Sequence, residues 1–169
     1  MGQRRGSSLI EEIGKAVQLR KEGRLKESNA LLVELAEKHP DDPEVRYQAA
    51  WSFDVIGEEA SAVPHYETAI RTGLSGKDLE RAYLGLGSTY RTLGDYEKSN
   101  EVFTRGREEF PENRAIQVFH AMVLYNLGRH TEAMELLLIN LSDTTSDPAI
   151  SEYGKAIRFY ADNLDQTWT

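Results

Sequence analysis

Apolar and small residues recur along the chain at the spacing of amphipathic helices. Residues 80–111 show this most clearly, because two short helices are predicted there on either side of Gly94. Their apolar faces follow a fixed order: Tyr83, Leu86, Gly87 and Tyr90, then Tyr96, Ser99 and Phe103. Pro111 ends the second helix. The stretch therefore predicts one helical hairpin, and looser copies of it occur on both sides.

The turn glycine of each predicted hairpin measures the repeat. These glycines are Gly23, Gly57, Gly94 and Gly128, separated by 34, 37 and 34 residues. The three extra residues of the middle step fall in residues 72–77, a turn-rich stretch between helices where added length costs little.

Equivalent positions in the four copies share size as well as spacing. Seven residues before each glycine and five after it, every copy has a small residue, which lets two helix backbones approach closely: Ala16, Ala50, Gly87 and Ala121, then Ser28, Ala62, Ser99 and Ala133. Four before and nine after stand bulky residues that fill the space: Leu19, Phe53, Tyr90 and Leu124, then Leu32, Tyr66, Phe103 and Leu137.

This order resembles the tetratricopeptide repeat, whose pattern is W-x2-L-G-x2-Y followed by a small residue, an aromatic residue and proline, with a period of 34 residues. The resemblance covers nearly the whole chain and is to small bacterial members of that family. It implies an all-α fold, a right-handed superhelical array of antiparallel helix pairs with four repeats plus a C-terminal capping helix.

The spacing of the turn glycines also predicts the domain organisation. Residues 1–7 are expected to be a disordered lead-in, and residues 8–164 a single domain. Its helix pairs are expected at about 8–40, 41–74, 78–111 and 112–141, with a capping helix at about 148–163 and a tail at 165–169. Trp168 is either part of a free tail or a lid packed back onto the array.

Composition narrows the possible functions. The net charge of −8 argues against nucleic-acid binding, which needs clustered basic residues. The chain has no cysteine, which excludes disulfides and thiolate sites and fits a reducing cytoplasm. No apolar run approaches the length of a membrane span, so no membrane partner is expected. We expect a cytoplasmic protein.

Catalytic and metal sites are not predicted. The four histidines, His39, His65, His120 and His130, lack the helical spacing of a metal site. Adjacent acidic pairs such as Glu58 and Glu59 point about 100° apart on a helix, so they cannot act together on one substrate. No nucleophile motif is present. The sequence predicts no enzyme, no catalytic residue, no metal and no cofactor.

The resemblance implies a concave groove lined by the first helix of each pair. The lining positions lie about ten, six and three residues before each glycine: Ile13, Val17 and Arg20; Tyr47, Trp51 and Asp54; Leu84, Ser88 and Arg91; Val118, Met122 and Tyr125. This stripe is mostly apolar and aromatic. It is either an exposed contact surface or packing between neighbouring first helices. Ile13 and Val17 stand where family members that hold a peptide carboxylate have lysine and asparagine, so that activity is not expected.

These observations predict a scaffold that binds a protein or peptide noncovalently. Two alternatives stay open: a regulator that senses a short apolar peptide, and an acidic helper that shields an apolar segment of one client protein. Tyr47, Trp51, Met122 and Tyr125 together predict a large apolar surface. We therefore expect a homodimer that covers it.

Overall fold

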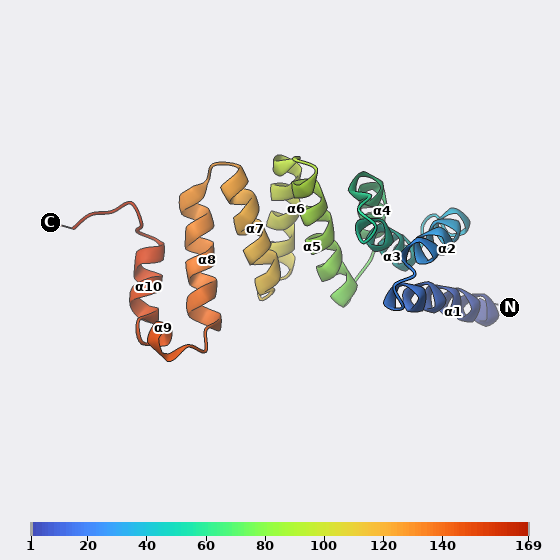
Figure 1. The fold of residues 1–169 in the computed structure, drawn as a ribbon, viewed down its shortest axis with the longest axis horizontal. Helices are drawn as coiled ribbons and strands as arrows, with labels where there is room; N and C mark the ends of the chain where they lie inside the picture. Colours follow the sequence, from blue (N-terminus) through green and yellow to red (C-terminus); the bar gives the residue numbers. More distant parts are fainter. Residues whose placement is uncertain (1, 169) are drawn as a thin grey trace. The chain divides into compact units, whose positions relative to one another are not determined.

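The computed structural model describes the backbone of residues 2–168 and the side chains of residues 8–168. All regular secondary structure in this range is helical, and it contains no strand (Figure 1). The helices are α1 (Gly2–Lys21), α2 (Leu25–Lys38), α3 (Pro43–Asp54), α4 (Glu59–Arg71), α5 (Gly76–Thr92), α6 (Tyr96–Glu109), α7 (Arg114–Asn126), α8 (His130–Thr144), α9 (Pro148–Glu152) and α10 (Gly154–Ala161). The predicted all-α fold of sequential antiparallel pairs is confirmed.

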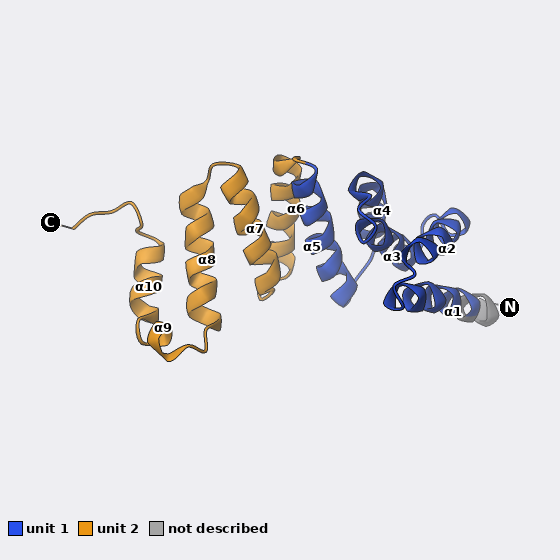
Figure 2. Cartoon of the chain, viewed as in Figure 1, with its two compact units in different colours: residues 1–93 blue, residues 94–169 orange. Residues whose placement is uncertain are grey.

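The chain divides into two compact units, residues 1–93 and residues 94–169 (Figure 2). In the first unit, each of the helices α1 to α5 packs against the next one. In the second unit, α6 packs on α7, α7 on α8, and α8 on α10. The boundary between Leu93 and Gly94 falls inside the third predicted pair, so the single domain stays a prediction.

The turn glycines adopt the backbone conformation that the hairpins need. Gly23, Gly57, Gly94 and Gly128 have φ values of 80°, 79°, 80° and 74°, in the left-handed region that other residues rarely enter. Each one follows the end of the first helix of a pair, where a left-handed residue closes the helix and reverses the chain. The four predicted turns are therefore confirmed.

Polar side chains begin two of the first helices. Asp42 precedes Pro43, and its carboxylate accepts a hydrogen bond from the Val45 N–H at 2.9 Å. Asn113 begins α7 in the same way, because its Oδ1 accepts from the Ile116 N–H at 3.0 Å. Such caps satisfy backbone donors that have no partner within the helix.

The eight small positions of the repeat are all buried, as the sequence predicts. Around them, Ile13, Leu32, Leu35 and Val45 form a core between α1, α2 and α3. A second core between α7 and α8 contains Ala121, Leu124, Ala133 and Leu136. The bulky set is less uniform, because Leu137 is 39% exposed while its counterparts Leu32, Tyr66 and Phe103 are buried. Leu137 lies on the helix after which only the short α9 and α10 follow.

At both ends of the helix array, the structure differs from the prediction. Helix α1 begins at Gly2 rather than near Ser8; Met1 lies outside the described residues. The predicted capping helix at 148–163 is two helices with a break at Tyr153. At the break, the Ser142 hydroxyl donates to the Gly154 carbonyl at 3.2 Å, and a Cβ on residue 154 would lie 3.3 Å from that hydroxyl. Glycine thus allows α10 to approach α8.

Candidate functional site

The first helices of the pairs carry the predicted contact residues, and in the first unit both α1 and α5 contact α3. We call the surface of these first helices the first-helix face. Ile13 and Tyr47 are only 5% and 2% exposed, so the prediction that they line an open groove is wrong. Ile13 belongs to the core, and Tyr47 packs between the rings of Trp51 and Tyr66. Both side chains are covered by packing within the first unit, so neither is accessible to a partner.

Trp51 and Arg20 form the accessible part of this face. Trp51 on α3 is 37% exposed, and the Arg20 guanidinium lies 3.9 Å from the centroid of its ring, in a cation–π contact. The Arg20 Nη2 donates to Gln48 Oε1 at 2.7 Å, which fixes the guanidinium over the indole. Partial burial lowers the pKa of Arg20 from its ordinary value. The pair presents an aromatic surface and a positive charge at one place.

Asp54, three residues after Trp51 on α3, belongs to a network that joins α3, α4 and α5. The Tyr66 hydroxyl donates to Asp54 Oδ2 at 2.7 Å, and the Thr89 hydroxyl donates to Oδ1 at 3.0 Å. Burial raises the pKa of Asp54, and these two hydrogen bonds oppose the increase. Burial also raises the pKa of Tyr47, to about 12. The network therefore fixes the helices that carry the face.

The remaining predicted residues of the first unit are partly buried. These are Val17 on α1, which packs against the core, and Leu84, Ser88 and Arg91 on α5. In the second unit, the first helix α7 exposes more: Met122 is 38% and Tyr125 is 64% exposed, while Val118 is partly buried. The Tyr125 ring contacts that of His130, with centroids 4.9 Å apart. Each unit thus presents a few accessible apolar side chains on its first helices.

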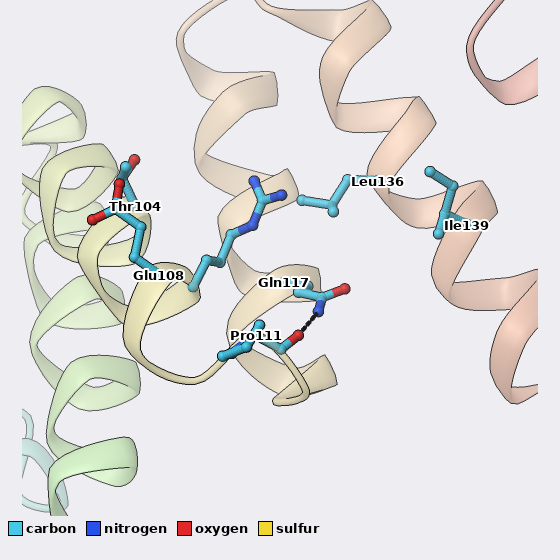
Figure 3. A pocket seen from close by; sticks show the side chains of 7 residues that line it. Thr104, Glu108, Pro111, Gln117, Leu136 and Ile139 are labelled. Atoms are coloured by element: carbon cyan, nitrogen blue, oxygen red, sulfur yellow. Dashed lines mark hydrogen bonds between the residues drawn. The ribbon is translucent and has the colours of Figure 1, made fainter.

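The second unit also contains a cavity of about 450 Å³ that the sequence does not predict (Figure 3). Its lining comes from α6, the loop after it, α7 and α8: Thr104, Arg107, Glu108, Pro111, Gln117, Leu136 and Ile139. The volume lies within the range of pockets that hold small ligands. Apolar side chains from α8 face polar ones from α6 across it (Figure 3).

One wall of this cavity is linked to a buried histidine. Arg107 Nη1 lies 3.3 Å from His120 Nδ1, and His120 Nε2 lies 2.8 Å from Asn100 Oδ1. Burial, and then the nearby Arg107, lower the pKa of His120 to about 4, so the ring is neutral at pH 7. Its Nδ1 then accepts from Arg107 and its Nε2–H donates to Asn100. Among the described residues, Arg107 has no acidic partner.

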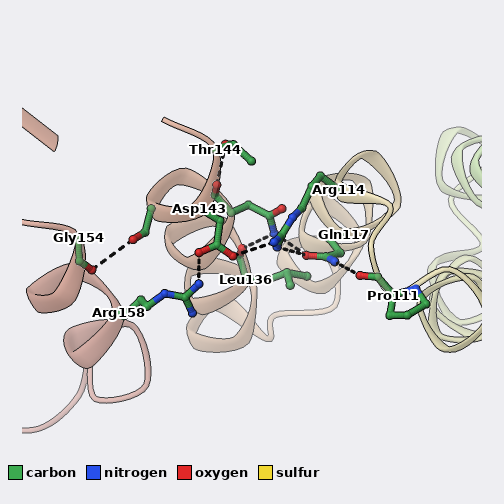
Figure 4. A network of polar contacts seen from close by, with 10 residues as sticks. Pro111, Arg114, Gln117, Leu136, Asp143, Thr144, Gly154 and Arg158 are labelled. Carbon is green, nitrogen blue, oxygen red and sulfur yellow. Dashed lines mark hydrogen bonds and ion pairs between the residues drawn. The ribbon is translucent and has the colours of Figure 1, made fainter. Parts of the chain in front are cut away.

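A polar network connects this region to the C-terminal helices (Figure 4). Asp143 near the end of α8 forms ion pairs with Arg114 of α7, at 2.9 Å, and with Arg158 of α10. Gln117 accepts from Asn140 at 2.9 Å and donates to the Pro111 carbonyl at 2.6 Å. One carboxylate thus joins α7, α8 and α10.

Two features of the site escape the sequence prediction. Gly85 on α5 lies against Tyr66, where an added Cβ would be 2.5 Å from the hydroxyl, so only glycine fits there. The sequence signal is a second glycine two residues before the repeat's own small position, Gly87. The contact between Arg107 and His120 has no such signal, because it joins residues 13 apart on different helices.

The part of the chain that the structure describes shows neither of two other kinds of site. Nowhere in it do three His, Cys, Asp or Glu side chains gather closely enough to hold a metal ion. None of its helices combines the length and the apolar character that crossing a membrane requires.

The chain is similar to known repeat proteins in both sequence and structure. The family model described as "Tetratrico peptide repeat" matches residues 43–164. No curated protein matches the chain. Among solved structures, YrrB, a TPR protein with an unusual peptide-binding site, is similar with a TM-score of 0.70 and 19% identity, over 92% of this chain and 79% of that one.

Two further structures show the same fold. PilF of Pseudomonas aeruginosa has a TM-score of 0.69 and 14% identity, over 98% of this chain and 79% of its own. MamA has a TM-score of 0.68 and 18% identity, over 92% of this chain and 87% of its own. At these identities the likeness concerns the fold alone.

Proposed function

The chain belongs to the tetratricopeptide repeat family, and from this premise we propose that it is a noncatalytic scaffold that binds a protein or peptide segment on its first-helix face. Proteins of this family generally bind proteins or peptides, and the similar YrrB is described as having a peptide-binding site. The observation that carries the proposal is the Trp51–Arg20 pair. A partly exposed tryptophan under a fixed guanidinium is a typical anchor of a protein interface, since tryptophan and arginine are enriched among the residues that contribute most to binding.

The side chains of the first-helix face indicate which kind of peptide segment would bind there. Trp51 offers apolar surface, and Arg20 offers a positive charge, because an arginine guanidinium stays protonated in proteins. A segment with an apolar side chain followed or preceded by a carboxylate fits both. In the second unit, Met122 and Tyr125 offer apolar surface without a fixed charge.

The proposal is tested by selecting peptides from a random library on the immobilised chain and measuring their affinity by calorimetry. Trp51→Ala should weaken binding at least tenfold, since aromatic anchors carry most of the binding energy. Met134→Ala is the matched control, because Met134 is an exposed apolar residue on the second helix α8. Equal losses in both variants, or none in Trp51→Ala, would refute the first-helix face as the binding surface.

The regulator and helper hypotheses use this same face and differ in their occupant, a short peptide or one abundant client. A cytoplasmic location and self-association also stay predictions. Tyr47 is buried, so it does not contribute to the apolar surface on which the prediction of a homodimer rests.

A further inference from the structure

The outer side of α10 departs from what a capping helix should present. The terminal element of a repeat array needs a polar outer face for solubility. Here Phe159 and Tyr160 are 55% and 50% exposed, and Trp168 of the following tail packs on both rings with centroids 5.7 Å away. Tyr153, just before α10, is 61% exposed. We call these four side chains the terminal aromatic patch.

Helix α10 packs on α8 through its opposite side. Ala161 is fully buried, and Gly154 and Ile157 are partly buried. In each earlier pair the first helix is covered by a second helix, as α3 is by α4 and α7 by α8. Among the described residues no helix covers α10 in this way. The terminal aromatic patch thus lies on a side that a helix covers elsewhere in the chain.

The charges of α10 indicate which helix fits this side. Lys155, Phe159 and Asp162 are spaced i, i+4 and i+7, so they share one face with the aromatic ring in the middle. Neither Lys155 nor Asp162 has an ionic partner among the described residues. The cation lies near the N-terminus of α10 and the anion at its C-terminal end, each at the end of the helix dipole that disfavours it.

An antiparallel copy of the same helix satisfies all three residues. A two-fold axis near Phe159 places this ring against its own copy, and it places Lys155 of one chain beside Asp162 of the other at both ends. Each charge then also lies near the favourable end of the partner helix dipole. A parallel arrangement would instead bring like charges together. From this self-complementarity we infer that a second copy of this chain docks on the terminal aromatic patch, with the two α10 helices antiparallel.

The exposed area of the terminal aromatic patch limits the size of the dimer interface. Four aromatic side chains that are about half exposed offer about 450 Å² per chain, if each buries about 200 Å² when fully covered. Leu164, which is 41% exposed, and the stem of Lys155 add to this surface, and an antiparallel α10 covers the part of it around Phe159, because Tyr160 points about 100° away on the helix. The interface is therefore no larger than the lower limit for a specific one, and we expect a weak dimer that forms at high protein concentration.

Charge reversal tests both the partner and its orientation. In sedimentation equilibrium of the full chain, Lys155→Glu and Asp162→Lys should each weaken dimerisation at least tenfold. An equimolar mixture of the two variants should dimerise as tightly as the parent, because one chain then carries two anions and the other two cations. Both positions are exposed, and thermal melts followed by circular dichroism should show an unchanged fold. A parent that is monomeric at several hundred micromolar, or a mixture no tighter than the single variants, overturns the inference.

A cross-linking experiment tests the two-fold axis directly. The chain has no cysteine, so Phe159→Cys introduces a single thiol. Under mild oxidation this variant should form a covalent dimer, whereas Ala115→Cys, exposed on α7, should not. Trp51→Ala should leave the dimer unchanged, because the first-helix face is not involved. Equal cross-linking of both cysteine variants, or a loss of the dimer in Trp51→Ala, would place the contact elsewhere, whatever the outcome of the peptide experiment.

Discussion

Replacing Gly85 by alanine should destabilise the chain although it improves helix propensity. Gly85 lies inside α5, where glycine costs about 1 kcal/mol relative to alanine. The added Cβ would lie 2.5 Å from the Tyr66 hydroxyl oxygen and 2.6 Å from the ring carbon that bears it. Tyr66 is 2% exposed and its hydroxyl is hydrogen-bonded to Asp54, so the ring cannot move away easily. Overpacking of this kind costs roughly 1–3 kcal/mol, and we expect the upper end of that range.

The net effect follows from the difference of these two contributions, a loss of about 2 kcal/mol in the free energy of unfolding. Gly14→Ala is the matched control, because Gly14 lies inside α1 and a Cβ there meets nothing within 4 Å. That variant should gain about 0.5–1 kcal/mol. Urea unfolding followed by far-ultraviolet circular dichroism measures both.

A second substitution separates the clash from other effects. Tyr66→Leu removes the two closest atoms, so adding Gly85→Ala to this background should no longer destabilise and should instead show the gain in propensity. If Gly85→Ala alone stabilises as Gly14→Ala does, Tyr66 does not pack against α5, and the argument for this close approach fails.

Three further predictions concern pH, packing and capping. The folded pKa of His120, about 4, lies below the ordinary value of about 6.5, so the unfolded chain binds the extra proton and stability falls as the pH decreases through this interval. From pH 7 to pH 5 this costs about 2 kcal/mol, which His120→Gln should remove and the exposed His130→Gln should not, in unfolding curves at both pH values. Ala121→Leu should lower the melting temperature through an overpacking cost of about 1–3 kcal/mol, whereas Ala115→Leu on the exposed side of α7 should change stability by less than about 0.5 kcal/mol. Asp42→Ala should cost about 1 kcal/mol in urea unfolding, since it removes the cap of α3; an unchanged midpoint would show that this cap contributes nothing.

A feature of this chain can be predicted from the sequence when the contacts that determine it join residues close together in the sequence. The turns at Gly23 and Gly128 follow from the sequence because a left-handed backbone needs glycine there, and small residues such as Ala50 mark close helix contacts. Which residues of the first-helix face are exposed cannot be predicted from the sequence in this way. A helical stripe shows which residues share a side, but packing of α3 with α1 and α5 decides that Tyr47 is covered and Trp51 is not.

The C-terminal end shows the same limit. A single glycine within a helical pattern costs only about 1 kcal/mol, so Gly154 does not by itself predict the break between α9 and α10. The hydrogen bond from the Ser142 hydroxyl to the Gly154 carbonyl lies at this break, and Ser142 is 12 positions away in the sequence. The aromatic residues of α10 are visible in the sequence, but their exposure depends on which side of the helix faces α8.

The position of Asp143 has a consequence for motion at this end of the chain. Helix α10 buries only Ala161 completely, and the pairing of this carboxylate with Arg158 is one of the contacts that attach it to α8. The Arg158 side chain is about half exposed, and such a pair contributes only about 0–1 kcal/mol and is screened by salt. The amides of α9 and α10 should therefore exchange with solvent through a local opening that leaves α7 and α8 folded, and added salt should make this opening more frequent.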